Sequence, residues 1–126
     1  MPEKTIFEKL QLKPGRSMVI LNAPHGYIQS AGSLPSNAGI SERSGPAFII
    51  QVFIRSRDEL ESQFSSLASL VEKNGILWIS YPKLTSKLKG DINRDTINQF
   101  AQNRGWTGVS IISIDEDWSA LRLKPL

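Results

Sequence analysis

The sequence predicts one small α/β domain built around a mixed β-sheet, and three observations favour this fold class. Several apolar runs have the length of a strand and do not alternate with polar residues, which is typical of strands buried on both faces. One such run leads through an amphipathic helix into the next, and the chain closes with two strands separated by a short turn. The length of 126 residues suits one core, so we expect residues 1–126 to form a single domain.

The N-terminal part of the chain is predicted to hold one strand beside a long irregular segment. Residues 3–10 have the apolar spacing of a short helix, and residues 13–16 form a turn that contains proline and glycine. The apolar run at 18–21 is a strand. Residues 22–46 are rich in glycine and proline, and only 27–31 indicate a short helix there. Irregular segments of this length in a small domain are usually functional or mobile.

The middle of the chain carries the clearest structural signal, a strand–helix–strand unit. The strands are expected at 48–54 and 76–79, with Ser56 as the helix N-cap and Asn74-Gly75 as the stop signal. The helix places apolar residues on one face, namely Leu60, Phe64, Leu67, Ala68 and Val71. A unit of this kind has parallel strands and a right-handed crossover.

A basic loop and a second helix precede the terminal strands. The loop spans 83–90, and the helix is predicted to begin near Asp91 or Asn93. The strands at 109–114 and 119–124 are joined by a short acidic turn. Because the turn is short, these two strands form an antiparallel hairpin.

Together these elements predict a small Rossmann-like three-layer sandwich with a five-stranded mixed sheet. Their order along the chain resembles the second half of the class I methyltransferase fold. In that fold the last strand inserts antiparallel beside its predecessors. Numbered along the chain, the five strands are therefore expected in the sheet order 1-2-3-5-4, ending in the C-terminal antiparallel hairpin.

The segment after the first strand argues against the usual cofactors of such folds. It reads Asn22-Ala-Pro-His-Gly-Tyr27, without a G-x-G pattern, and no acidic residue closes a second strand. Pro24 also lacks the amide N–H that a phosphate site requires. We therefore expect neither S-adenosylmethionine nor a dinucleotide, and no other cofactor. With no cysteine and only one histidine, a thiolate or multi-histidine metal site is excluded, and no metal is expected.

A group of cations follows the third predicted strand. Tyr81-Pro82-Lys83 leads to Lys87 and Arg94, close to the start of a helix, where backbone amides and the helix dipole also favour negative charge. We interpret this Lys83–Arg94 edge as a candidate anion site. The alternative is a solvated loop with ordinary surface lysines.

Two polar residues after the first strand are expected at the same edge of the sheet. Asn22 either bonds its own loop backbone or a ligand, and His25 is either a surface residue or a general base. The candidate ligand-binding residues are therefore Asn22, His25, Tyr81, Lys83, Lys87 and Arg94.

Three strings carry a resemblance to a known family: Val19-Ile-Leu-Asn-Ala-Pro-His-Gly-Tyr27, Gly75-Ile-Leu-Trp-Ile-Ser-Tyr-Pro-Lys83 and Asp117-Trp-Ser-Ala-Leu-Arg122. With them the chain resembles, over nearly its whole length, the bacterial domain of unknown function 3052 family. The resemblance implies no particular activity. It does direct attention to the matching motif positions at the strand ends, among them Asn22, Tyr81, Lys83 and Arg94.

These observations favour a non-enzymatic binding or regulatory domain on a methyltransferase-like scaffold that lacks the cofactor loop. Its partner would be a small anion or a protein bound at the Lys83–Arg94 edge. The alternative is an enzyme acting on a phosphorylated or carboxylated small molecule, with Lys83 and Arg94 holding the anion and His25 or Tyr81 handling protons. A net charge of +3 is too small to favour nucleic-acid binding.

The remaining expectations concern assembly and location. The hairpin leaves the strand at 109–114 on the edge of the sheet, so a homodimer could form there and bury Trp106 or Trp118. The first residues are charged and no apolar stretch of signal-peptide or membrane-spanning length follows. We therefore expect a cytoplasmic protein without a membrane segment.

Overall fold

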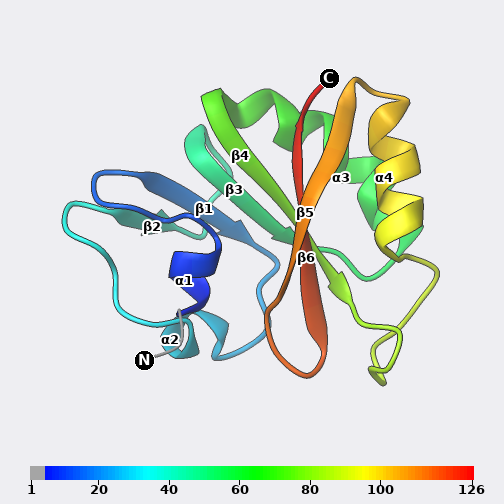
Figure 1. Ribbon diagram of the computed structural model, residues 1–126, viewed down its shortest axis with the longest axis horizontal. Coiled ribbons are helices and arrows are strands. Elements are labelled where there is room, and N and C mark those ends of the chain that lie inside the picture. The colour runs from blue at the N-terminus through cyan, green and yellow to red at the C-terminus, as the bar shows by residue number, and fades with distance from the viewer. Residues whose placement is uncertain (1–4) are drawn as a thin grey trace.

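The computed structural model describes residues 5–126 and consists of a six-stranded sheet with helices on both faces (Figure 1). The strands in chain order are β1 (Ser17–Leu21), β2 (Gly39–Ser41), β3 (Ala47–Phe53), β4 (Val71–Pro82), β5 (Trp106–Ser113) and β6 (Trp118–Pro125). Their order in the sheet is β2-β1-β3-β4-β6-β5. Strands β1 to β4 pair in parallel, and β6 is antiparallel to both of its neighbours.

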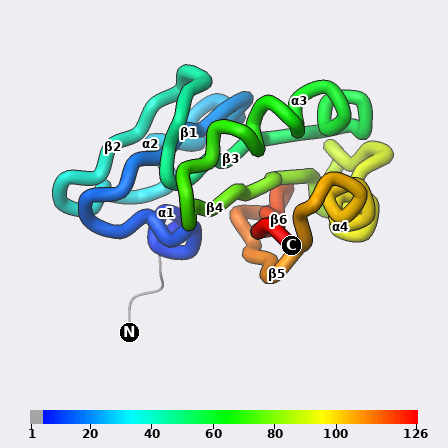
Figure 2. The backbone as a smooth tube through the Cα atoms, turned by 90° about the horizontal axis from the view of Figure 1, so that it is seen from above, coloured from blue at the N-terminus to red at the C-terminus, as the bar shows by residue number. Residues whose placement is uncertain are grey.

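The helices form the two outer layers. They are α1 (Ile6–Lys9), α2 (Tyr27–Ser30), α3 (Arg57–Leu70) and α4 (Arg94–Gln102). Side chains of α3 and α4 pack on one face of the sheet, and those of α1 and α2 pack on the other. Figure 2 shows α1 and α3 on opposite sides of the strands. The predicted three-layer α/β class is confirmed. No helix within residues 5–126 is long and apolar enough to cross a membrane.

The helix starts follow from local sequence chemistry. The Ser56 hydroxyl accepts the N–H of Glu59 at 3.2 Å and caps α3, as predicted. Asn93 caps α4 through a reciprocal pair of hydrogen bonds with Thr96. Thr5 caps α1 in the same way, so this helix begins later than predicted, and residues 3 and 4 of its expected range lie outside the described residues.

The five predicted strands occur in the predicted order, and the sheet has one strand more. Strand β2 lies inside the segment 22–46, which is predicted to be loop with a short helix. It pairs in parallel with β1, with Met18 opposite Ile40. Its three residues include a glycine and a serine, and they offer too short a pattern to predict a strand.

Strand β4 is also longer than predicted. It begins at Val71, directly after α3, so Asn74-Gly75 lies inside the strand and does not separate it from the helix. Asn74 adopts a φ of 65°, and the register with β3 shifts between Ala47 and Ile49. The chain therefore makes a bulge here, a feature that also favours asparagine and glycine.

Candidate functional site

Parallel sheets of this type bind ligands beyond the carboxyl ends of their strands, so this edge positions any site. After β1 the chain forms β2 on one side of this strand and then β3 on its other side. Such a switch point opens a crevice between the loops. Two pockets of the described chain lie at this edge, one beside β1 and β2 and one beside β4 and α4.

The first, which we call the β1–β2 pocket, has a volume of about 450 Å³. It is lined by residues 23–29 and by Glu42. Glu42 directly follows β2, whose Ser41 pairs with Val19 of β1. The expectation that no acidic residue closes a second strand is therefore wrong, because it depended on not recognising β2.

A chain of buried hydrogen bonds supports one wall of the β1–β2 pocket. The Tyr27 hydroxyl donates to Gln51 Oε1 at 2.9 Å, and Gln51 Nε2 donates to Ser80 Oγ at 2.9 Å. Both Gln51 and Ser80 are fully buried in the sheet. Burial raises the pKa of Tyr27 well above its ordinary value; the bond with Gln51 opposes this shift and the charge of Asp115 adds to it. Tyr27 is therefore a neutral donor, held in place from inside the core.

The loop between β1 and α2 is shaped by two residues with positive φ. Asn22 has φ 61° and Gly26 has φ 81°. The Asn22 Nδ2 group donates to Gln63 Oε1 of α3 at 3.1 Å, so its side chain does not bond its own loop as expected. His25 is exposed and lines the β1–β2 pocket.

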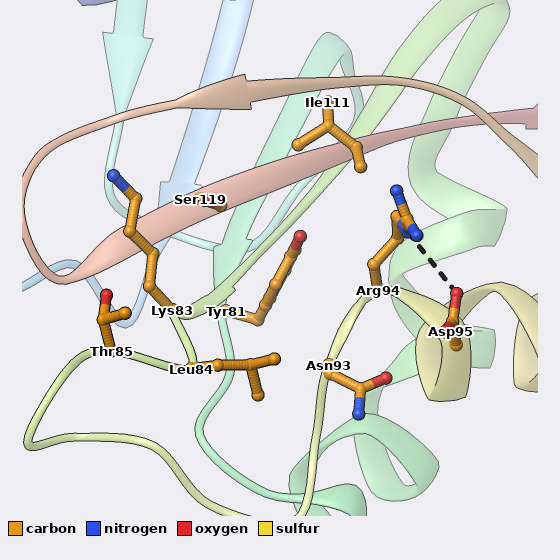
Figure 3. A pocket seen from close by; sticks show the side chains of 9 residues that line it. All are labelled: Tyr81, Lys83, Leu84, Thr85, Asn93, Arg94, Asp95, Ile111 and Ser119. Atoms are coloured by element: carbon orange, nitrogen blue, oxygen red, sulfur yellow. Dashed lines mark hydrogen bonds and ion pairs between the residues drawn. The ribbon is translucent and has the colours of Figure 1, made fainter.

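The second pocket, which we call the β4–α4 pocket, has a volume of about 320 Å³. Its floor comes from three adjacent strands, through Tyr81 of β4, Ser119 of β6 and Ile111 of β5. Its walls are the loop at 83–85 and the start of α4 at 93–95. Figure 3 shows the side chains of the loop and the helix on either side of the Tyr81 ring.

Two cations of the β4–α4 pocket come from different elements. Lys83 Nζ donates to Ser113 Oγ at 2.7 Å, and Arg94 Nε lies 3.4 Å from Asp95 Oδ1 (Figure 3). The Lys83 backbone N–H donates to the carbonyl of Asp117 at 2.8 Å. The Ser86 hydroxyl donates to Asp117 Oδ1, also at 2.8 Å. The loop that carries Lys83 is thus fastened to the turn between β5 and β6.

The Tyr81 hydroxyl is a polar group of the pocket floor, beside the hydroxyl of Ser119. The Tyr81 side chain is only 7% exposed, and burial raises its pKa above the ordinary value. The Arg94 guanidinium opposes this shift, Asp95 adds to it, and a hydrogen bond with Ser119 opposes it. Because burial dominates, the hydroxyl stays neutral near neutral pH and adds no negative charge to the pocket.

The structure brings three of the six candidate residues together. Tyr81, Lys83 and Arg94 line the β4–α4 pocket. His25 lines the β1–β2 pocket instead, so the pairing of His25 with the cations in one cleft has no support in the geometry. Lys87 is exposed and is not among the lining residues of either pocket.

Two residues were not identified from the sequence: Glu42, which lines the β1–β2 pocket, and Gln51, which supports its wall. Glu42 was hidden because the strand before it is only three residues long. Gln51 carried a visible signal, because an amide in the middle of an apolar strand must find a buried partner. The residue types near Gln51 did not reveal that this partner would be Tyr27.

The tryptophans of the hairpin region belong to the protein's own core. Trp118 is 5% exposed and stacks edge-on against Phe53, with ring centroids 4.9 Å apart. Trp106 packs edge-on against Phe64. Strand β5 does lie at the edge of the sheet, as predicted, but a homodimer there would bury Val109 and Ile111, which are exposed, in place of Trp118.

No protein-family model matches the chain, and no curated protein matches its sequence. Solved structures do match its fold. One is the DhpI–SAH complex, with a TM-score of 0.65 and 12% identity over 95% of this chain and 82% of that chain. The ribosomal protein L11 methylase from Lactobacillus delbrueckii subsp. bulgaricus has a TM-score of 0.60 and 13% identity over 94% and 74%. Magnesium protoporphyrin IX methyltransferase from Synechocystis with bound SAH has a TM-score of 0.56 and 11% identity over 87% and 74%.

These neighbours show that the chain has the α/β fold of S-adenosylmethionine-dependent methyltransferases. They contradict the hypothesis of a non-enzymatic binding or regulatory domain on a methyltransferase-like scaffold that lacks the cofactor loop. That hypothesis depended on the missing G-x-G pattern and on the missing acidic residue after a second strand. The G-x-G pattern is indeed missing. An acidic residue is not, because Glu42 directly follows the strand β2.

Proposed function

We propose that this chain is an S-adenosylmethionine-dependent methyltransferase domain whose cofactor binds in the β1–β2 pocket. One observation carries the proposal: β2 brings Glu42 against the loop at 23–29, at the switch point of the sheet. In α/β sheets of this kind, an acidic residue at such a position accepts hydrogen bonds from the ribose hydroxyls of a bound nucleoside. The solved structures of the same fold support this choice of cofactor, since two of them contain SAH.

The loop chemistry fits a nucleoside cofactor without phosphate groups. Pro24 offers no N–H, and α2, which follows the loop, has only four residues, so neither provides a cradle for a pyrophosphate. S-Adenosylmethionine has a ribose but no phosphate, and it needs no such cradle. The features that argue against a dinucleotide therefore leave S-adenosylmethionine as the better match.

Glu42 would hold the ribose, and the residues of the 23–29 loop would surround the remainder of the cofactor. A bound S-adenosylmethionine would supply an electrophilic methyl group for transfer to an acceptor. The chain's own contribution is to fix the site. The bond from Tyr27 to Gln51 holds the end of the loop against the core.

Isothermal titration calorimetry of the purified chain with S-adenosylmethionine and S-adenosylhomocysteine tests the proposal. The Glu42→Gln variant should bind both about tenfold more weakly, because a charge-assisted hydrogen bond contributes about 1.5–3 kcal/mol and the amide retains part of it. Glu72→Gln is the matched control, since Glu72 is also an exposed glutamate but lies at the opposite end of the sheet, near the start of β4. No binding of either compound to the unmodified chain, or equal losses in both variants, would refute the proposed site.

A further inference from the structure

We propose that the β4–α4 pocket binds the anionic group of the methyl acceptor, and that this acceptor is a small amphiphilic molecule with a carboxylate or phosphate on an apolar body. The assignment to an acceptor rests on the proposed methyltransferase function. The anion site itself stands on the geometry of Lys83, Arg94 and Tyr81.

Two cations line the pocket, on opposite sides of the Tyr81 ring (Figure 3). Lys83 reaches the pocket from the loop after β4, and Arg94 reaches it from the first turn of α4. Only one carboxylate, that of Asp95, lines the same pocket, which leaves two positive charges against one negative charge. Carboxylates and phosphates are the ligands that such a pair of cations binds most strongly.

Both cations keep donors for a ligand. Lys83 Nζ has three N–H groups and its contact with Ser113 takes one of them. Arg94 faces Asp95 through Nε, and Figure 3 shows one of its terminal nitrogens directed away from that carboxylate, toward Ile111. The Tyr81 hydroxyl, which stays neutral, adds a polar group on the floor between them without repelling an anion.

The apolar part of the pocket defines the rest of the ligand. Leu84 is 68% exposed and Ile111 is 41% exposed, and both line the pocket beside the Tyr81 ring. Exposed aliphatic side chains next to cations are suited to a molecule that is charged at one end and apolar at the other. The volume of about 320 Å³ lies at the lower end of the range for small-molecule sites.

The position of the pocket is consistent with an acceptor. The β1–β2 pocket and the β4–α4 pocket lie at the same carboxyl edge, with β3 between β1 and β4 in the sheet. The first pocket borders α2 and the second borders α4, on opposite faces of the sheet, so ligands of the two pockets would meet only beyond the end of β3.

The test uses phenyl phosphate and benzoate as probes, with 2-phenylethanol as the neutral comparison, titrated into the full chain by NMR or calorimetry. Lys83→Gln and Arg94→Gln should each weaken binding of both anions about tenfold, the effect of losing one charge-assisted hydrogen bond. Lys87→Gln is the matched control, because it removes the same charge from the same loop outside the pocket. It should leave the affinity within about twofold, since an exposed charge is screened by salt.

The outcomes separate this inference from the proposed function. Equal losses in Lys87→Gln and Lys83→Gln, or probes that bind no better than 2-phenylethanol, would overturn the anion site even if S-adenosylmethionine binds. Anion binding that depends on Lys83 and Arg94, with no binding of S-adenosylmethionine, would keep the site and refute its role in methyl transfer. The proposal in full requires that Lys83→Gln bind S-adenosylmethionine normally and that Glu42→Gln bind phenyl phosphate normally.

Discussion

The two pockets at the carboxyl edge of the sheet are built in different ways. The β1–β2 pocket is supported from inside, by the buried hydrogen bonds that join Tyr27, Gln51 and Ser80. The β4–α4 pocket displays Lys83 and the largely exposed Arg94 on a loop and a helix start. Buried polar groups are costly to leave unpaired, whereas exposed charges contribute little to stability. Substitutions in the buried support of the β1–β2 pocket should therefore destabilise the fold. Substitutions of the exposed charges of the β4–α4 pocket should hardly change its stability.

The largest expected effect comes from removing the buried hydrogen bonds that support the β1–β2 pocket. Gln51→Leu leaves the hydroxyls of Tyr27 and Ser80 without their partner, so the free energy of unfolding should fall by about 2–4 kcal/mol. Urea unfolding followed by circular dichroism measures this change. Gln63→Leu is the control: it removes a glutamine whose side chain bonds to the exposed Asn22, and it should cost less than about 1 kcal/mol. If the free energy of unfolding fell by a similar amount in the two variants, the buried hydrogen bonds would contribute no more to stability than the exposed one.

A pH titration sharpens the comparison, because each pocket contains one of the two tyrosines of the chain. Both pKa values are raised by burial, but near Tyr81 the Arg94 charge opposes the shift. The native state thus holds both protons above pH 10.0, the ordinary value, where the unfolded chain releases them. Stability is therefore full below that pH and declines as the pH rises above it.

Ultraviolet absorbance of the phenolate measures this titration directly. We expect both tyrosines of the native protein to ionise above the ordinary tyrosine pKa, because burial raises both pKa values. Tyr27→Phe and Tyr81→Phe should each remove one of the two steps. A native titration with both steps at the value of free tyrosine would show that neither hydroxyl is protected.

The smallest expected effect concerns the exposed pair in the β4–α4 pocket. Arg94→Gln breaks the contact with Asp95 and should change the free energy of unfolding by less than about 0.5 kcal/mol. The same variant is expected to lose affinity for phenyl phosphate, so binding and stability would separate at this residue. A loss of stability comparable to that of Gln51→Leu would show that Arg94 has a structural role.

The strands could be predicted because their signals are local, whereas the order of the sheet was predicted from the resemblance to the class I methyltransferase fold. Apolar runs identify β1, β3 and β4, and the short acidic turn requires β5 and β6 to pair as a hairpin. The cap Ser56 was also predicted, since capping depends on residues three positions apart, and the second helix start was predicted near Asp91 or Asn93, of which Asn93 is the cap. Predictions of this kind need no knowledge of distant contacts.

The pockets were less predictable because they depend on such contacts. Strand β2 exists only through its pairing with β1, and Glu42 acquires its position from that pairing. Lys83 and Lys87 look alike in sequence, yet only Lys83 is held by Ser113 and lines a pocket. What distinguishes them is the turn between β5 and β6, about thirty residues further along the chain.

That turn and the strand after it complete the β4–α4 pocket. Strand β6 is the final strand of the chain, but it lies between β4 and β5 in the sheet, so β5 joins the rest of the sheet only through it. Ser119 of the pocket floor belongs to β6, and Asp117, which fastens the Lys83 loop, immediately precedes it. A chain that stops before residue 117 would retain the residues of the β1–β2 pocket and lose the β4–α4 pocket. The lining of the β4–α4 pocket therefore depends on β6, whereas every lining residue of the β1–β2 pocket lies before residue 43.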